Sequence, residues 1–104
     1  MNKLYTILVP TRWGDRPEIP IRKKHHKEWD KRIIKIAGGL TILSSGLGKW
    51  NFQGTTFNEK VIPVMVMCNE KDIRKIIDIT ISHYKQKAVM YYCVTQEVEV
   101  VYAD

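Results

Sequence analysis

A glycine-rich segment followed by an acidic residue is the part of the sequence best suited to binding a ligand. The segment covers residues 46–54 and includes Gly48 and Trp50, and Glu59 follows it just before an apolar run. Glycine lets the backbone approach a ligand closely, and an aromatic ring offers a flat surface to a base or a sulfonium. A carboxylate such as Glu59 can hold a cationic group or move a proton. The alternative is a hairpin whose Trp50 packs on the sheet and whose Glu59 is solvated.

Other reactive side chains give weaker indications of chemistry. The glycine spacing matches neither of the two common phosphate-binding motifs. His25 and His26 would point about 100° apart on a helix, so a solvated helix start is favoured over a shared ligand. His83 is expected to be structural. Cys68 and Cys93 lie in apolar runs and are predicted to be buried free thiols, because a metal site needs more ligands at suitable spacing. We therefore expect no metal and no cofactor.

The length and composition are those of one globular domain. The chain has 104 residues, 44% of them apolar, so residues 1–104 are expected to form a single domain with one core. No apolar run approaches the roughly 20 residues that span a bilayer, and the first residues lack the features of a signal peptide. The sequence thus predicts a cytoplasmic protein with no membrane partner.

The chain is basic, with a formal net charge of +6. Nine of its 17 Lys and Arg residues lie between Arg12 and Lys35, where a basic loop and a solvated helix face account for much of the charge. A sheet that reads RNA needs exposed aromatic residues on its central strands, and only Tyr91 and Tyr92 could serve. Nucleic acid is therefore disfavoured as a partner.

The apolar pattern predicts two helices and four strands in the order βαββαβ. The expected elements are a strand over 4–9, a helix over 25–37, strands over 40–43 and 60–68, a helix over 70–85 and a strand over 88–94. Gly38 is expected to end the first helix, and Asn69 to cap the second. Pro63 favours an edge position or a bulge for its strand. Residues 97–102 are expected to form an edge strand or to extend the last one.

This order predicts an α+β fold of the ferredoxin-like kind, with an antiparallel sheet and two helices on one face. The other face is the informative one. In the third predicted strand, Val64 and Val66 alternate with Met65 and Met67, so both faces are apolar, and the fourth strand has the same property. A sheet with one wet face alternates with polar residues instead. We therefore expect a homo-oligomer; the alternative is that the tail or the Trp50 loop covers this face.

The second half of the chain resembles the phage-encoded S-adenosylmethionine lyases. The likeness rests on Gly48-Lys49-Trp50, on Asn58-Glu59-Lys60-Val61 and on the apolar run 64–68 with the helix that follows it. It continues loosely through residues 89–92 to the end of the sequence. The same Gly-x-Trp and downstream Glu are also similar to small bacterial and phage proteins of unknown function.

The lyase resemblance implies a trimer that cleaves S-adenosylmethionine to methylthioadenosine and homoserine lactone in the host cytoplasm. Gly48, Trp50 and Glu59 would bind the substrate, with Trp50, in place of the family's tyrosine, packed on the adenine. Glu59 would also be catalytic by holding the amino group or the sulfonium, while the substrate's own carboxylate attacks its γ-carbon. Two alternatives stay open: a non-catalytic oligomeric ligand-binding or regulatory module of the same fold, and a basic nucleic-acid-binding protein.

Overall fold

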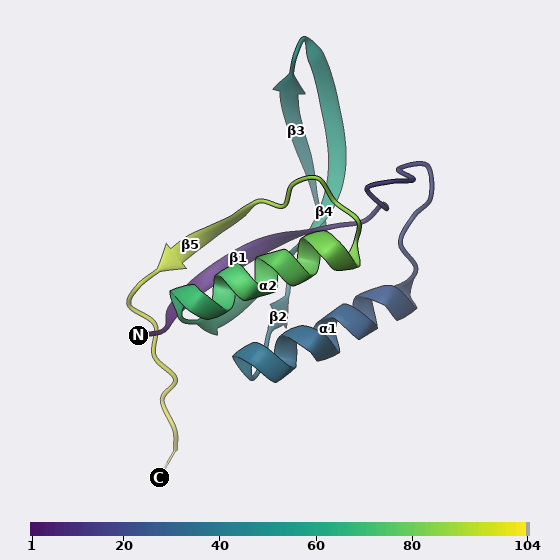
Figure 1. Ribbon diagram of the computed structural model, residues 1–104. Helices are drawn as coiled ribbons and strands as arrows, with labels where there is room; N and C mark the ends of the chain where they lie inside the picture. The colour runs from purple at the N-terminus through teal and green to yellow at the C-terminus, as the bar shows by residue number, and fades with distance from the viewer. Residues whose placement is uncertain (104) are drawn as a thin grey trace.

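An antiparallel sheet carries both helices on one of its faces (Figure 1). The computed structural model describes residues 1–103, except for the side chains of Trp50 and Phe52. In chain order the elements are β1 (Lys3–Pro10), α1 (Lys23–Ala37), β2 (Thr41–Ile42), β3 (Gly46–Phe52), β4 (Thr55–Cys68), α2 (Glu70–His83) and β5 (Tyr91–Thr95). The strand order is β2-β4-β1-β5, and β3 pairs with β4. The predicted α+β, ferredoxin-like arrangement is confirmed.

The strand β3 was not predicted, because the expected strands left residues 44–59 without a strand. In the structure β3 pairs with the first half of β4, which is therefore longer than the predicted strand over 60–68. Gln53 and Gly54 both have positive φ and form the two-residue turn between the strands. Backbone hydrogen bonds between β3 and β4 stabilise the hairpin. Because these bonds do not depend on apolar side chains, the sequence shows little apolar pattern here.

Pro63 lies in an interior strand and not at the edge that its type suggested. The strand β4 pairs with β1 on one side and with β3 and β2 on the other. The carbonyl of Pro63 accepts a hydrogen bond from the N–H of Leu43 at 2.9 Å, so the backbone of Pro63 points toward the β2–β3 side. There the outer ladder changes from β3 to β2, and the missing N–H of proline falls at this break.

The helix ends follow the sequence closely. Gly38 adopts a left-handed conformation after α1, and its N–H donates to the carbonyl of Ile34. The side chain of Asn69 accepts a hydrogen bond from the Asp72 N–H at 2.8 Å, as expected of an N-cap. The helix α1 begins two residues before the predicted start, and the part of the last predicted strand that precedes Tyr91 is not strand. Residues 97–102 form no strand either.

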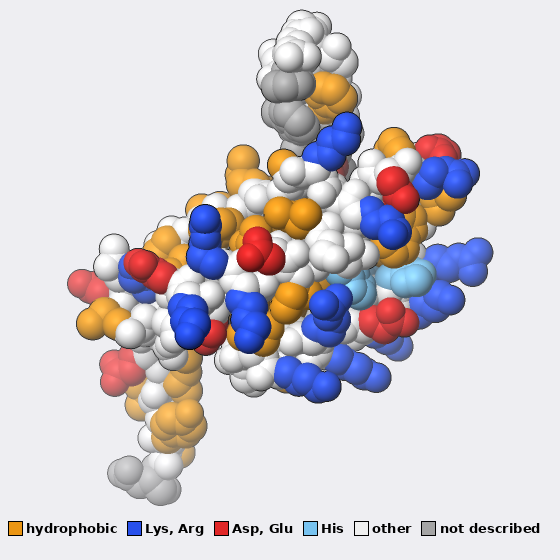
Figure 2. All heavy atoms as spheres, viewed as in Figure 1, with side chains coloured by type: hydrophobic (Ala, Val, Ile, Leu, Met, Phe, Trp, Pro, Cys, Tyr) orange, Lys and Arg blue, Asp and Glu red, His pale blue; other side chains and the backbone are white. Residues whose placement is uncertain are grey.

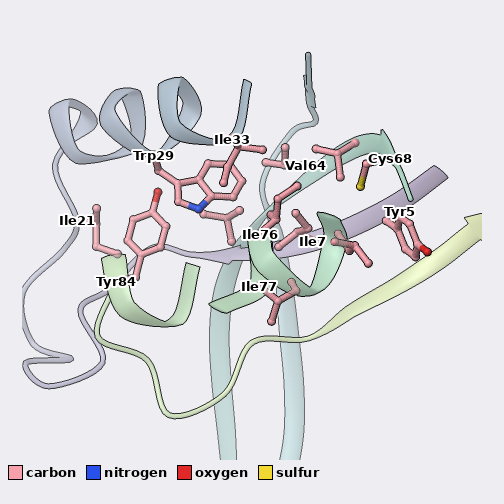
Figure 3. Packing of buried hydrophobic residues seen from close by; sticks show 13 residues of the cluster. Tyr5, Ile7, Ile21, Trp29, Ile33, Val64, Cys68, Ile76, Ile77 and Tyr84 are labelled. Atoms are coloured by element: carbon pink, nitrogen blue, oxygen red, sulfur yellow. The ribbon is translucent and has the colours of Figure 1, made fainter. Parts of the chain in front are cut away.

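The core lies between the helices and the sheet (Figure 3). Trp29 and Ile33 reach it from α1, and Ile73, Ile76 and Ile77 from α2. The sheet contributes alternate residues of its two central strands, namely Tyr5, Ile7 and Val9 from β1 and Val64, Val66 and Cys68 from β4. Because side chains alternate along a strand, the residues between these six lie on the opposite face.

Candidate functional site

The hairpin of β3 and β4 carries the three residues predicted to bind a substrate. Gly48 is the direct cross-strand partner of Glu59, and Trp50 is the partner of Phe57. The structure thus brings Gly48 and Glu59 together. The stacking predicted for the ring of Trp50 lies outside the described residues. Space for a Cβ exists at Gly48, whose nearest neighbour would be the Glu59 carbonyl oxygen at 3.5 Å, so packing within the chain does not demand glycine there.

Two clefts in the described part of the chain lie away from this hairpin. One, of about 50 Å³, lies between α1 and the sheet beside Trp29 and Ile42. The other, of about 440 Å³, lies at the edge of the sheet near the start of α2. Neither is lined by Gly48 or Glu59. The role of Gly48 and Glu59 in ligand binding therefore stays a prediction.

The open face of the sheet, opposite the helices, is the larger feature. We define it by the residues that alternate with the core positions: Leu4, Thr6 and Leu8 of β1, Pro63, Met65 and Met67 of β4, and Tyr92 and Val94 of β5. Thr6 pairs with Met65 on one side and with Tyr92 on the other, so these three form a row across three strands. Tyr92 is 50% exposed and Val94 is 48% exposed. Apolar side chains dominate this surface.

Neither segment proposed as an alternative cover lies over the open face. The hairpin of β3 and β4 projects beyond the sheet, and the chain after β5 leads away from it (Figure 1). This tail exposes further apolar side chains, with Val101 82% and Tyr102 83% exposed. Lys and Arg side chains are spread over the outer surface of the helices instead (Figure 2). The described chain thus has a basic helical side and an apolar sheet side.

The three histidines join the two helices rather than forming a solvated start. His26 was expected to be solvated, but its Nδ1 lies 2.7 Å from the hydroxyl of Tyr84, and burial is the main cause of its lowered pKa. His83 is structural, as predicted. Its Nε2 lies 2.9 Å from the His25 carbonyl, and its Nδ1 lies 3.1 Å from the Arg32 guanidinium. Because a carbonyl only accepts and a guanidinium only donates, Nε2 of His83 donates to the carbonyl and its Nδ1 accepts from Arg32.

The loop after β1 packs on the end of α2 and lines neither of the two clefts described above. Gly14 donates its N–H to the Tyr84 carbonyl at 3.1 Å. A Cβ at Gly14 would lie 1.9 Å from the Lys85 carbonyl oxygen, so this close approach requires glycine. Trp13 contacts the His25 ring with centroids 4.9 Å apart. The loop is a structural connection between β1 and the helices.

The two cysteines differ in their surroundings. Cys68 is buried, as predicted, whereas Cys93 is exposed, contrary to the prediction. Cys93 pairs with Tyr5 of β1, next to a shift in the register of the two strands. Cys93 lines the larger cleft, at the edge of the sheet near the start of α2. We call this the edge cleft. Among the described residues, no group of three or more His, Cys, Asp or Glu could hold a metal ion.

The edge cleft contains charged residues that the sequence analysis did not single out. The Lys3 ammonium forms an ion pair with the Glu70 carboxylate. The hydrogen bond between them raises the pKa of Lys3 and lowers that of Glu70. Nη1 of Arg74 donates to the Tyr91 hydroxyl at 3.3 Å. These residues are far apart in the sequence and lie in no recognisable motif, so only the fold reveals them.

The fold and the open sheet face define a class of small ferredoxin-like domains, and several solved structures share this fold. One is the divalent cation tolerance protein Cut A1 of Thermus thermophilus, with a TM-score of 0.66, 10% identity and coverage of 100% of this chain and 88% of that one. The periplasmic divalent cation tolerance protein CutA of Archaeoglobus fulgidus has a TM-score of 0.69, 11% identity and coverage of 96% and 88%. CutA1 of Oryza sativa has a TM-score of 0.69 and 10% identity, with coverage of 95% of this chain and 83% of that one.

No protein-family model matches the sequence, and no curated protein is similar to it. At about a tenth of identical residues, the structural likeness establishes the fold alone.

These comparisons correct the family resemblance. The similar structures are CutA proteins and not S-adenosylmethionine lyases, so the assignment of the chain as a lyase, its substrate and its phage origin are wrong. The resemblance rested on a short Gly-x-Trp segment and on apolar runs that many βαββαβ proteins contain. The catalytic role given to Glu59 depended on that activity and is withdrawn with it.

No helix in the described part of the chain is both long and apolar enough to cross a membrane.

Proposed function

We propose that this chain, residues 1–104, is one non-catalytic ferredoxin-like module that self-associates through the open face of its sheet. The observation that carries the proposal is the apolar surface opposite the helices, which includes Leu8, Met65 and Tyr92. An antiparallel sheet that faces water on one side carries polar residues there. A contiguous apolar surface of this kind is typical of a protein interface.

The geometry of the open face suits packing against a second sheet. Thr6 is 3% exposed although no helix lies over it, because its cross-strand partners Met65 and Tyr92 flank it. Their larger side chains stand on either side and give the face an uneven apolar surface. Two such faces can interdigitate at about the 10 Å spacing of packed sheets.

The projecting hairpin is a second contact element in this proposal. A two-stranded ribbon is marginally stable by itself in water, and Leu47 on β3 is 64% exposed. A neighbouring copy would cover such side chains. Gly48 and Glu59 lie opposite each other in this hairpin, and we propose that they contact the neighbouring copy or a ligand held beside it.

The names of the similar structures refer to divalent cation tolerance. Our proposal takes from these proteins the ferredoxin-like domain and not the cation, because no cluster of three metal-binding side chains occurs in the described part of this chain. We also propose a cytoplasmic location. Its support is that Cys68 and Cys93 are both free, as is usual in a reducing compartment.

Sedimentation velocity or light scattering at micromolar concentration tests self-association directly. We expect a mass that is a multiple of 12.2 kDa, the mass of one chain. The same measurement gives the number of copies. A mass of one chain across the micromolar range would overturn the proposal.

A further inference from the structure

The edge cleft lies where three elements meet at one end of the sheet. The start of β1, the start of α2 and the end of β5 come together there (Figure 1). The cleft has a volume of about 440 Å³, within the range of about 300–1,000 Å³ that is usual for small-molecule sites. Its lining includes Lys3, Tyr5, Glu70, Ile73, Arg74 and Tyr91.

The charges of the cleft favour a ligand with one negative charge. Lys3 and Arg74 are cationic and Glu70 is anionic, which leaves one positive charge in excess. The ion pair with Glu70 occupies the Lys3 ammonium, whereas Arg74 has one long hydrogen bond, to the hydroxyl of Tyr91. A guanidinium presents two parallel N–H groups that match the two oxygens of a carboxylate. Arg74 is thus the group best placed to receive an anion.

The apolar part of the cleft favours a planar ring. Tyr5 and Tyr91 both line it, with ring centroids 6.1 Å apart and planes inclined by 59°. Ile73 of α2 also lines the cleft and is buried. Aromatic rings prefer offset or tilted partners at about this separation, so a third ring can pack against the exposed part of Tyr91.

We propose that the edge cleft binds a small aromatic monocarboxylate, with its carboxylate on Arg74 and its ring against Tyr91. This inference supplies a ligand for the proposed module. It rests on the proposal that the module is non-catalytic, so the cleft is assigned binding and no reaction. It does not require assembly, because Tyr5 and Tyr91 are on the helical side of the sheet. Binding and oligomeric state can therefore succeed or fail separately.

Calorimetric titration of the full chain with 2-naphthoate tests the proposal, and 2-naphthamide is the neutral control. We expect the carboxylate to bind about tenfold more tightly than the amide or better, because a guanidinium forms stronger hydrogen bonds with a charged carboxylate than with a neutral amide. Equal affinities, or no binding of 2-naphthoate at millimolar concentration, would overturn the proposal. The mass of the protein is measured in the same samples, so failure of assembly is recognised independently.

Three variants locate the site: one should weaken binding, one should tighten it, and one is a control. Arg74→Gln should weaken 2-naphthoate binding about tenfold, whereas Lys75→Gln, an exposed neighbour outside the cleft, should change it less than about twofold. Glu70→Gln should tighten binding, because it removes the competing carboxylate and frees the Lys3 ammonium. Equal effects of Arg74→Gln and Lys75→Gln, or weaker binding by a folded Glu70→Gln protein, would contradict the assigned site.

Cys93 provides a second readout at the same place. Its exposed thiol lines the cleft, so saturating 2-naphthoate should slow its modification by a thiol reagent, and 2-naphthamide at the same concentration should not. An unchanged rate at saturation would place the bound naphthoate elsewhere and overturn the proposal.

Discussion

At the scale of single residues, His26 couples the packing of the helices to pH. Tyr84 is buried, and burial raises its pKa far above the neutral range, so its hydroxyl keeps its proton. That hydroxyl lies 2.7 Å from Nδ1 of His26. The pKa of His26 is lowered first by burial and then by the nearby His83 and His25. The folded protein therefore favours the neutral imidazole.

We predict that the free energy of unfolding decreases as the pH falls below about 6.5, the ordinary pKa of histidine. Below that value the unfolded chain binds a proton at His26 that the folded chain resists, so protonation favours unfolding. Urea unfolding at about pH 7.5 and about pH 5.5 measures the difference, on either side of the ordinary histidine pKa. His26→Gln should reduce it. An equal pH dependence in the variant would show that His26 is not the group responsible.

The two thiols should react at different rates. Cys68 is buried, and burial, with a smaller contribution from Asp72, raises its pKa to about 11. Cys93 is exposed. Because the thiolate is the reactive form, we predict that native protein has one fast thiol and that the other reacts after denaturation. Cys93→Ser should abolish the fast phase, and Cys68→Ser should retain it. A fast phase in native Cys93→Ser protein would contradict this assignment.

At the scale of elements, one polar contact links the two helices within the apolar core. The indole N–H of Trp29 donates to the Thr80 hydroxyl at 3.0 Å, and that hydroxyl donates to the Ile76 carbonyl at 2.7 Å. Trp29 is 1% exposed and Thr80 is 0% exposed. Water therefore cannot replace either partner without a rearrangement of the helices.

We predict that Thr80→Val lowers the free energy of unfolding by about 1–3 kcal/mol, because it leaves the buried indole N–H without its acceptor. Thr80→Ser keeps the hydroxyl and should cost about 1 kcal/mol or less for the lost methyl group. Chemical denaturation of both variants measures the difference. If Thr80→Val were as stable as the parent, the hydrogen bond would not contribute to stability.

The elements with a buried stripe are the ones that the sequence predicted best. The strand β1 and the helix α2 place apolar residues at the spacing that their geometry requires, so their existence followed from the pattern. The strand β3 bears Gly46 and Gly48 and is largely exposed, so no pattern distinguished it from a loop. The edge cleft was missed for another reason. Lys3 and Glu70 are 67 positions apart, and only the packing of α2 beside β1 brings them together.

At the scale of the whole molecule, the described chain is elongated, with extents of 52 × 29 × 25 Å. The hairpin and the tail project from the sheet in different directions (Figure 1). A chain of this size can gain stability by covering its open face and projections with other copies. The apolar face opposite the helices was predicted from the two-sided pattern of Val64–Met67, and the fold confirms the helix-free face on which that prediction depended.

We predict that a single charge on the open face prevents self-association without unfolding the chain. Met65 lies in β4, which runs between β1 and β2, and it pairs with Thr6 of β1 and Thr41 of β2. An unpaired carboxylate buried there between two copies would cost several kcal/mol, so Met65→Glu should raise the dissociation constant about 100-fold or more. Ile34→Glu is the matched control, because Ile34 is 44% exposed on α1, on the helical side. Sedimentation of both variants, with circular dichroism to verify folding, measures the effect. Loss of association in both variants, or in neither, would show that the open face is not the contact surface.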